Sequence, residues 1–194
     1  MSTDNKISET SADFLLMLEE YEKTVDEIQE EFLSNVNQLM LSNEITNKTL
    51  MESIIQITII DENKWLDNCD EEKWFRKIFA NLSKFVPLFA KTCKEIPAQI
   101  ELLDGILECF IKNWSSSCSK KDKRVHRIPV LIRCLYDFEI LSVSAIMDWY
   151  ESEINKQNNQ IVDQKRQIQE DFMKQIKPFI GWLESPPDDE EEED

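Results

Sequence analysis

Few of the side chains that usually carry chemistry in proteins are placed here to do so. The chain has one histidine, His126, whose neighbours Arg124 and Arg127 are basic, with no serine or cysteine motif of a hydrolase beside it. The only glycines, Gly105 and Gly181, are too far apart to form a glycine-rich phosphate loop. We therefore interpret His126 as a surface or capping residue and expect no nucleotide-binding loop.

The five cysteines lack the spacing of a metal site or of a disulfide framework. They are Cys69, Cys93, Cys109, Cys118 and Cys134, an odd number without a Cys-x-x-Cys pair. The sequence therefore predicts no metal and no cofactor. Because residues 1–10 are also polar and lack an apolar signal segment, we expect a reducing, cytoplasmic setting.

Aromatic residues beside carboxylates form the pattern that points to recognition. Trp149 and Tyr150 lie between Asp148 and Glu151, and Trp182 is followed closely by Glu184. An acidic rim on an aromatic ring suits a partner rich in lysine or arginine. Packing is still the commoner role for the rings themselves, as it is for Trp74 and Trp114 on apolar helical stripes.

The net charge favours the same kind of partner. Thirty-nine acidic residues against 22 basic ones give a formal charge of −17, which repels nucleic-acid phosphates and anionic membrane surfaces. We thus expect a basic protein partner, and neither nucleic acid nor membrane. Dispersed acids can serve solubility alone, but the seven consecutive acids from Asp188 to Asp194 are clustered.

The elements that must position these residues are predicted to be helices, because apolar residues recur at steps of three and four. Only the run Ile54 to Ile60 would also suit a buried strand, and no second strand-like run exists to pair with it. The expected helices are one from Phe14 to Phe32, one ending near Ser42, one capped by Thr46, one capped by Asp70 and bent or broken at Pro87, a central one from Pro97 to Trp114, one opened by Pro129, one capped by Ser142 or Ser144, and one from about Asn158 to Leu183 kinked at Pro178.

This order of elements predicts an all-α fold of stacked antiparallel helical hairpins, although no sequence period repeats. We expect a flexible N-terminus over residues 1–10, one helical domain over residues 11–184 and a disordered acidic tail over residues 185–194.

Two segments resemble the acidic-aromatic boxes of a known domain. Leu135-Tyr136-Asp137-Phe138-Glu139-Ile140-Leu141 with Ala145-Ile146-Met147-Asp148-Trp149-Tyr150-Glu151 resembles the first box, and Pro178-Phe179-Ile180-Gly181-Trp182-Leu183-Glu184 with the acids after it resembles the second. The domain is the two-tryptophan, HEAT-like domain of translation initiation factor five and of the epsilon subunit of the exchange factor for initiation factor two. The upstream segment Phe85-Val86-Pro87-Leu88-Phe89 is similar to the epsilon branch.

The resemblance implies a HEAT-like stack and a set of partner-binding residues. It implies binding to lysine-rich stretches on the beta subunit of initiation factor two, with other initiation-factor or exchange-factor subunits as further candidates. The residues it marks are Tyr136, Asp137, Glu139, Asp148, Trp149, Glu151, Trp182, Glu184, Asp188, Asp189, Glu190 and Glu191.

In the epsilon branch the resemblance also implies release of GDP from the gamma subunit through a carboxylate near the start of the domain. An ungapped match places Asp13 there, and a shifted match places Glu19 or Glu20 there. Such exchange breaks no bond, since it works by differential affinity for two states of the partner. Two alternatives stay open, a non-catalytic binder or competitor like the factor-five branch and an acidic helical scaffold unrelated to translation.

Overall fold

The computed structural model describes residues 29–42, 45–56, 71–116, 127–158 and 164–185. These residues form helices and the turns between them, without a strand, so the all-α prediction is confirmed for them. The predicted N-terminal region, most of the first predicted helix and residues 186–194 of the predicted acidic tail lie outside the described residues.

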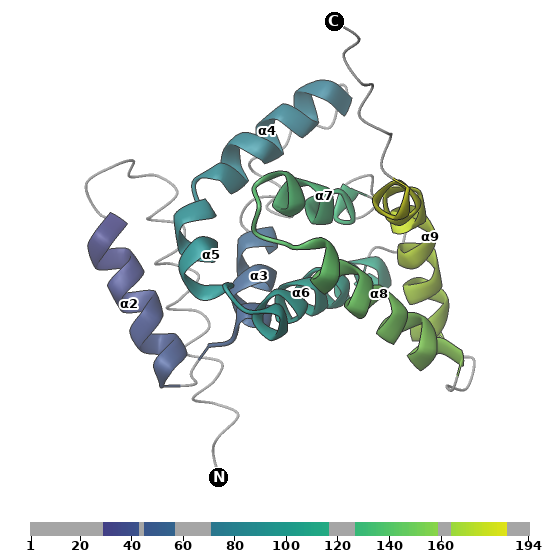
Figure 1. The fold of residues 1–194 in the computed structure, drawn as a ribbon, viewed down its shortest axis with the longest axis horizontal. Coiled ribbons are helices and arrows are strands. Elements are labelled where there is room, and N and C mark those ends of the chain that lie inside the picture. Colours follow the sequence, from purple (N-terminus) through teal and green to yellow (C-terminus); the bar gives the residue numbers. More distant parts are fainter. Residues whose placement is uncertain (1–28, 43–44, 57–70, 117–126, 159–163, 186–194) are drawn as a thin grey trace, which may run out of the picture.

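In Figure 1, α2, α4 and α9 lie toward the edges of the view, and α3, α6 and α7 lie near its middle. Their bounds are α2 Gln29–Leu41, α3 Asn47–Ile55, α4 Glu71–Ser83, α5 Val86–Thr92, α6 Ile96–Ser116, α7 Val130–Asp137, α8 Val143–Asn158 and α9 Gln164–Glu184. Of the ambiguous run Ile54 to Ile60, Ile54 and Ile55 are helical, as predicted, and residues 57–60 lie outside the described residues.

Hydroxyl groups cap two of these helices where the sequence predicted them. The Thr46 hydroxyl accepts from the Thr49 backbone N–H at 3.2 Å and starts α3. The Ser142 hydroxyl accepts from the Ala145 backbone N–H at 3.2 Å and starts α8. Each bond satisfies a backbone donor that the first helical turn leaves without a partner.

Proline and a polar stretch account for two boundaries. The predicted break near Pro87 is confirmed, since α4 ends at Ser83 and Pro87 lies in the first turn of α5, where a missing N–H costs nothing. The predicted start of the last helix at Asn158 is wrong. Asn158 ends α8 and α9 begins at Gln164, because a run of polar residues carries no apolar period that could mark the boundary. Pro178 lies inside α9, and the predicted kink stays a prediction.

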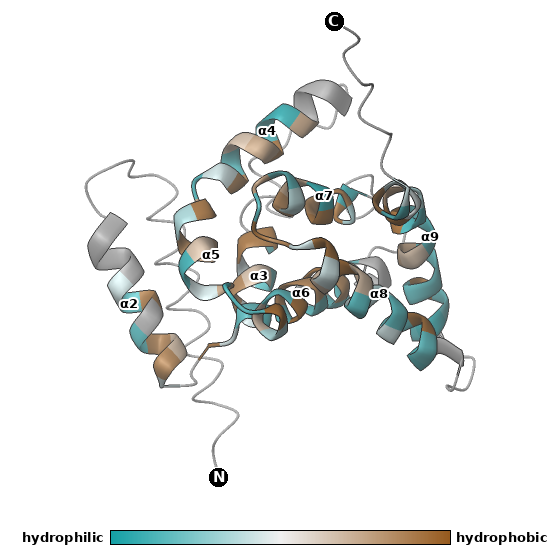
Figure 2. Ribbon diagram, in the orientation of Figure 1, coloured by the Kyte–Doolittle hydropathy of each residue, from teal (hydrophilic) through white to brown (hydrophobic). Residues whose placement is uncertain are grey.

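The central helix is α6, which contacts α3, α7, α8 and α9 (Figure 1). Its Leu102, Leu103, Ile106 and Phe110 are fully buried, and the Phe110 ring lies 4.9 Å from that of Phe172 on α9. Figure 2 shows apolar residues gathered around α3, α6 and α7, while the outer turns of α8 and α9 are hydrophilic. Burial of each such side chain stabilises the fold by about 1.5–3 kcal/mol.

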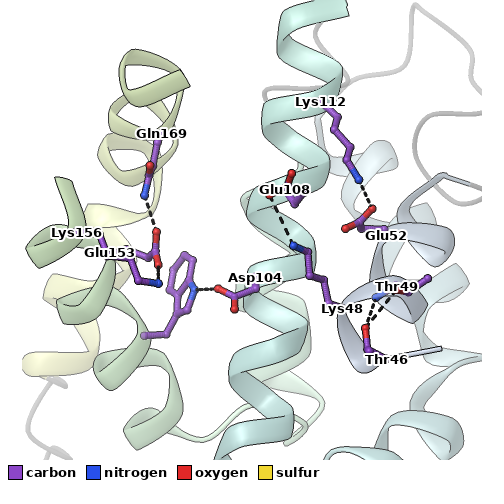
Figure 3. Close-up of polar contacts among 11 residues, drawn as sticks. Thr46, Lys48, Thr49, Glu52, Asp104, Glu108, Lys112, Glu153, Lys156 and Gln169 are labelled. Carbon is purple, nitrogen blue, oxygen red and sulfur yellow. Dashed lines mark hydrogen bonds and ion pairs between the residues drawn. The ribbon is translucent and has the colours of Figure 1, made fainter. Parts of the chain in front are cut away.

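Helices α3 and α6 approach so closely that one position must be glycine. A Cβ on Gly105 would lie 2.6 Å from the backbone oxygen of Lys48 and 3.0 Å from the Cβ of Met51. Two ion pairs bridge the same helices, Lys112 to Glu52 at 2.6 Å and Lys48 to Glu108 at 3.7 Å (Figure 3). Gly105 is therefore a packing residue, and its lack of a side chain sets the α3–α6 distance.

A buried glutamine joins the two connections that lead into α6 and α8. The Gln99 Nε2 donates to the Cys93 backbone oxygen at 3.2 Å, and its Oε1 accepts from both the N–H and the hydroxyl of Ser142 at 2.9 Å. Since Gln99 is only 8% exposed, these bonds are shielded from water. They fix the start of α8, and with it the carboxylates that α8 carries.

We predict that Gly105→Ala lowers the free energy of unfolding by about 1–3 kcal/mol, because the new methyl group meets a backbone oxygen that cannot move away. Gly181→Ala is the matched control, since a Cβ there meets nothing within 4 Å. It should raise stability by up to about 1 kcal/mol through helix propensity. Urea denaturation of both variants measures the difference, and equal effects would contradict the close packing of α3 on α6.

Candidate partner-binding surface

Three aromatic rings bring the ends of α7 and α9 together. The Tyr136 ring centroid lies 5.7 Å from that of Phe179 and 6.0 Å from that of Trp182, both edge-on, and the Phe179 and Trp182 rings stack at 5.9 Å. Edge-on and offset geometries are those that aromatic pairs prefer. Trp182 is nevertheless 45% exposed. The cluster therefore joins the two boxes and leaves part of an indole ring open to a partner.

The helix ends beside this cluster are acidic. Asp137 is the last residue of α7 and Glu184 the last of α9, and neither helix has a basic residue in its last turn. A helix C-terminus already carries a partial negative charge, which cations normally offset. Here carboxylates add to it at both ends. Because Tyr136 and Trp182 hold these ends together, their negative potentials add at one place.

One basic side chain moderates this potential. Arg133 lies 3.8 Å from Asp137, one turn earlier on α7, and both side chains are exposed. A pair of this kind stabilises by about 1 kcal/mol or less, so a basic group of a partner can replace Arg133 at little cost.

Glu139 is held in a backbone conformation that glycine usually takes. Its φ is 60°, in the left-handed region, and it follows Phe138, the C-cap residue of α7. The Glu139 N–H donates to the Tyr136 oxygen at 2.8 Å and the Ile140 N–H to the Leu135 oxygen at 2.9 Å, which is the Schellman arrangement of a helix end. An exposed glutamate at this position adds another carboxylate to the end of α7 at a conformational cost.

Trp149 differs from Trp182, because its side chain is only 1% exposed. Its Nε1–H donates to the Asp104 carboxylate of α6 at 3.0 Å, and its ring lies edge-on to Phe172 of α9 at 6.3 Å. The ring therefore presents almost no surface to a partner in this structure, and the predicted part of Trp149 in partner binding stays a prediction. The ring joins α6, α8 and α9 from within, which is the packing role that the sequence also allowed.

A second buried group ties α8 to α9. The Glu153 carboxylate, almost fully buried, accepts from Gln169 of α9 and from Lys156 at 2.5 Å each (Figure 3). The bond to Glu153 raises the pKa of the Lys156 ammonium, against the opposing effect of burial, so Lys156 is charged at neutral pH. This network holds the buried side of α8 in place.

The outer side of α8 carries the remaining described candidates. Asp148 and Glu151 are exposed and line a shallow hollow together with Ser152, Asn155 and Lys156, all from α8. Lys156 offsets part of their charge. This hollow is polar, and it lacks the exposed aromatic ring that marks the junction of α7 and α9.

The other predicted site residues lie outside the described part of the chain. They are the candidate exchange carboxylates Asp13, Glu19 and Glu20 and the tail residues Asp188, Asp189, Glu190 and Glu191. Conversely, Asp104 and Phe179, although the latter is part of the second box, were not predicted as site residues, and they contact Trp149 and Trp182. Asp104 gave no local signal, because its partner is 45 residues away.

The cysteine thiols among the described residues are not in the reactive thiolate form. Burial raises the pKa of Cys93 to about 11 and those of Cys109 and Cys134 to about 12, so all three are protonated at neutral pH. Within the described ranges, histidine, cysteine and acidic side chains form no group of three that could hold a metal ion. The described helices also include none that is long and apolar enough to cross a membrane.

Residues 98–194, half of the chain, match the family model described as W2: eIF4-gamma/eIF5/eIF2-epsilon. The chain belongs to the W2 family. The W2 match covers nearly all of α6 and the whole of α7, α8 and α9, and thus every described candidate residue of the surface. It begins after α5, so α2 to α5 lie upstream of the matched W2 segment.

Plant initiation factors are among the proteins to which the chain is similar. The chain is 29% identical over 105 residues to the probable eukaryotic translation initiation factor 5-2 of Arabidopsis thaliana, which is 54% of this chain and 21% of that protein. It is 35% identical over 85 residues to eukaryotic translation initiation factor 5 of Zea mays, which is 43% of this chain and 16% of that protein. The chain thus spans about a fifth of the length of these relatives.

We predict that Glu139→Gly raises the free energy of unfolding by about 1 kcal/mol, because it relieves a left-handed glutamate and removes a carboxylate from a helix C-terminus. Glu139→Asn is the matched control, since asparagine tolerates this conformation and also removes the charge, and it should raise stability less. Urea denaturation compares them. A loss of stability in Glu139→Gly would show that the side chain supports the fold.

Proposed function

We propose that this W2 chain is a translation-initiation module that binds a lysine-rich segment of an initiation factor, with the beta subunit of initiation factor two as the partner. The observation that carries the proposal is the junction of two acidic helix ends at the exposed Trp182. Family membership and the factor-five names of the relatives support the setting. The same setting makes the chain a cytoplasmic protein.

The chemistry of the junction suits an ammonium or guanidinium group. The face of an indole attracts a cation by about 0.5–2 kcal/mol, depending on how far water is excluded. Asp137, Glu139 and Glu184 supply negative charge close to that ring. Each exposed pair contributes about 1 kcal/mol or less, so a segment with several basic residues binds through the sum of many weak contacts.

The acidic tail and the hollow on α8 also take part in binding the basic segment. The seven acids from Asp188 to Asp194 follow α9 in sequence and lengthen the acidic region beyond Glu184. A cluster of acids attracts a basic partner at long range and raises its association rate at low salt. Asp148 and Glu151 provide a second acidic area on α8 for a longer basic segment.

Nucleotide exchange on the gamma subunit of initiation factor two is the finer form of the proposal. The family description includes the epsilon branch, which supports it. It requires a carboxylate among Asp13, Glu19 and Glu20. The alternative is a binder without exchange activity, and the factor-five names of the relatives favour that branch.

We predict that charge reversal at the junction weakens binding of a lysine-rich peptide from the beta subunit. The double variant Glu139→Lys with Glu184→Lys should weaken it roughly tenfold or more at low salt, because two attractions become repulsions. Fluorescence anisotropy with labelled peptide measures the dissociation constant at low and at high salt. The difference between variant and wild type should shrink at high salt, where surface charges are screened.

A matched variant separates local from overall charge. The double variant Asp171→Lys with Glu170→Lys changes the net charge of the protein by the same amount as the junction variant. Both of its substitutions lie on α9, about three turns before Trp182. It should weaken binding of the peptide by only about twofold, through the long-range electrostatic field of the protein. Equal losses in the two double variants would mean that binding follows net charge alone, and the junction would then not be the docking surface.

We predict that Asp13→Ala, Glu19→Ala or Glu20→Ala abolishes faster GDP release if the chain is an exchange module. The measurement is the release rate of labelled GDP from purified initiation factor two with and without the chain, next to binding in the same buffer. Binding without faster release would assign the chain to the non-catalytic branch. No binding and no acceleration would rule out the translation proposal.

A further inference from the structure

Pro178 deprives one backbone oxygen of α9 of its usual hydrogen-bond donor. In an α-helix the N–H of each residue donates to the carbonyl oxygen four residues earlier. Proline has no N–H, so the carbonyl oxygen of Lys174 receives no such bond from residue 178. Both Lys174 and Pro178 are exposed. This carbonyl oxygen can therefore accept a hydrogen bond from a donor outside the helix.

The Trp182 ring lies on the same side of α9 as this carbonyl oxygen. Helical side chains lean toward the N-terminus and cover the turn before their own position. The Trp182 indole does so, since it stacks on Phe179, three residues earlier, with 5.9 Å between the ring centroids. Pro178 is four residues before Trp182 and thus on the same face of the helix. The exposed indole therefore covers the turn at which the helical hydrogen bond is missing.

The side chains of Lys174 and Gln175 turn away from this carbonyl oxygen. The Lys174 ammonium lies 3.5 Å from the Asp171 carboxylate. The Gln175 side-chain amide donates to the Asp171 backbone oxygen at 3.3 Å. Both side chains are thus directed toward the N-terminus of α9, whereas the carbonyl oxygen of Lys174 points toward the C-terminus, where Pro178 lies.

The surface next to Trp182 on this face of α9 is open. Gly181 lies on the same face as Pro178, and a Cβ on it would meet nothing within 4 Å. Lys177 lies about a quarter turn around the helix from Pro178, so it flanks this face. Glu184, the last residue of α9, adds a carboxylate one turn later. A cation beside the indole is therefore close to both a carboxylate and a backbone oxygen.

We infer that the carbonyl oxygen of Lys174, made available by Pro178, accepts a hydrogen bond from a lysine ammonium group of the partner that lies beside Trp182. The inference rests on the proposed function and adds to it a preference for a cation that carries N–H groups. Indole rings and carboxylates attract any cation, whereas a carbonyl oxygen binds only a hydrogen-bond donor. Pro178 is thereby a positioning residue of the docking surface, although proline inside a helix lowers stability.

Two synthetic peptides of equal charge test the inference. One carries lysines, and the other carries trimethyllysines, which keep the charge but have no N–H to donate. Wild-type protein should bind the lysine peptide about fivefold or more tightly in fluorescence anisotropy at low salt, because only lysine can bond to the carbonyl oxygen. Pro178→Ala supplies a backbone N–H to the Lys174 carbonyl and should reduce this preference to about twofold or less.

Stability separates this role of Pro178 from a purely structural one. Pro178→Ala should raise the midpoint of urea unfolding, because it restores a helical hydrogen bond, and yet weaken binding of the lysine peptide. Gly181→Ala is the matched control, since it also favours helix in the same turns but gives the carbonyl no donor. It should keep the preference for lysine. Pro178→Gln supplies the same N–H and replaces Pro178→Ala if that variant fails to unfold cooperatively.

The NMR chemical shift of the Lys174 carbonyl carbon gives a direct readout of the bond. In wild type this shift should change more on addition of the lysine peptide than on addition of the trimethyllysine peptide, because only lysine donates to the oxygen. In Pro178→Ala the two peptides should change it alike, since the backbone N–H of residue 178 already occupies the oxygen.

The outcomes separate this inference from the proposed function. If wild type binds both peptides equally, or if Pro178→Ala and Pro178→Gln keep the preference, the carbonyl oxygen takes no part in binding and the inference is overturned. Loss of the preference in Gly181→Ala as well would assign it to helix rigidity and would also overturn the inference. The docking surface stands in all these cases. If neither peptide binds wild type at low salt, the proposed docking surface fails, and the inference fails with it.

Discussion

The close contact of α3 with α6 sets the position of most other elements. Gly105 allows the two helix backbones to approach until only a hydrogen fits between them, and two lysine–glutamate pairs bridge the contact at its rim. With that face of α6 occupied, its other faces are left for α7, α8 and α9. Phe110, Phe172 and Trp149 meet there, one from each of three helices. The ends of α7 and α9 are held near each other because both are anchored to the same central helix.

The candidate surface contains charges and a backbone conformation that destabilise the helix ends on which they lie. Helices α7 and α9 end in carboxylates, where a cation would be favourable, and Glu139 adopts a conformation in which glycine would cost less. Such choices persist where the surrounding packing fixes the backbone, and they cluster at functional sites. Buried groups beneath the surface supply that packing, since Trp149, Glu153 and Gln99 each hold α8 through shielded hydrogen bonds. The buried hydrogen bonds therefore stabilise the helices whose exposed ends carry the unfavourable carboxylates.

Local sequence signals predicted the helices well where their physical cause is local. Thr46 and one of Ser142 and Ser144 are predicted as caps because a hydroxyl before a helical stripe accepts from the first turn, and in the structure Thr46 and Ser142 do so. Pro87 was predicted to end a helix because it lacks a donor, and the chain breaks just before it. The boundary near Asn158 was missed because a polar run carries no period. The two acidic-aromatic segments were recognised as a pair, but their meeting at Tyr136 and Trp182 was not predictable from spacing.

The sequence by itself determined the helical class, the central helix with its continuous apolar stripe, the acidic charge and the residue types of the two boxes. These properties depend on composition and on neighbours three or four residues apart, which any helix brings together. Only the tertiary structure decided which tryptophan is buried and which is exposed, since Trp149 and Trp182 have similar acidic neighbours in the chain. It also decided that Gly105 is a close contact and that Phe79 meets Phe138, because these depend on how distant helices pack.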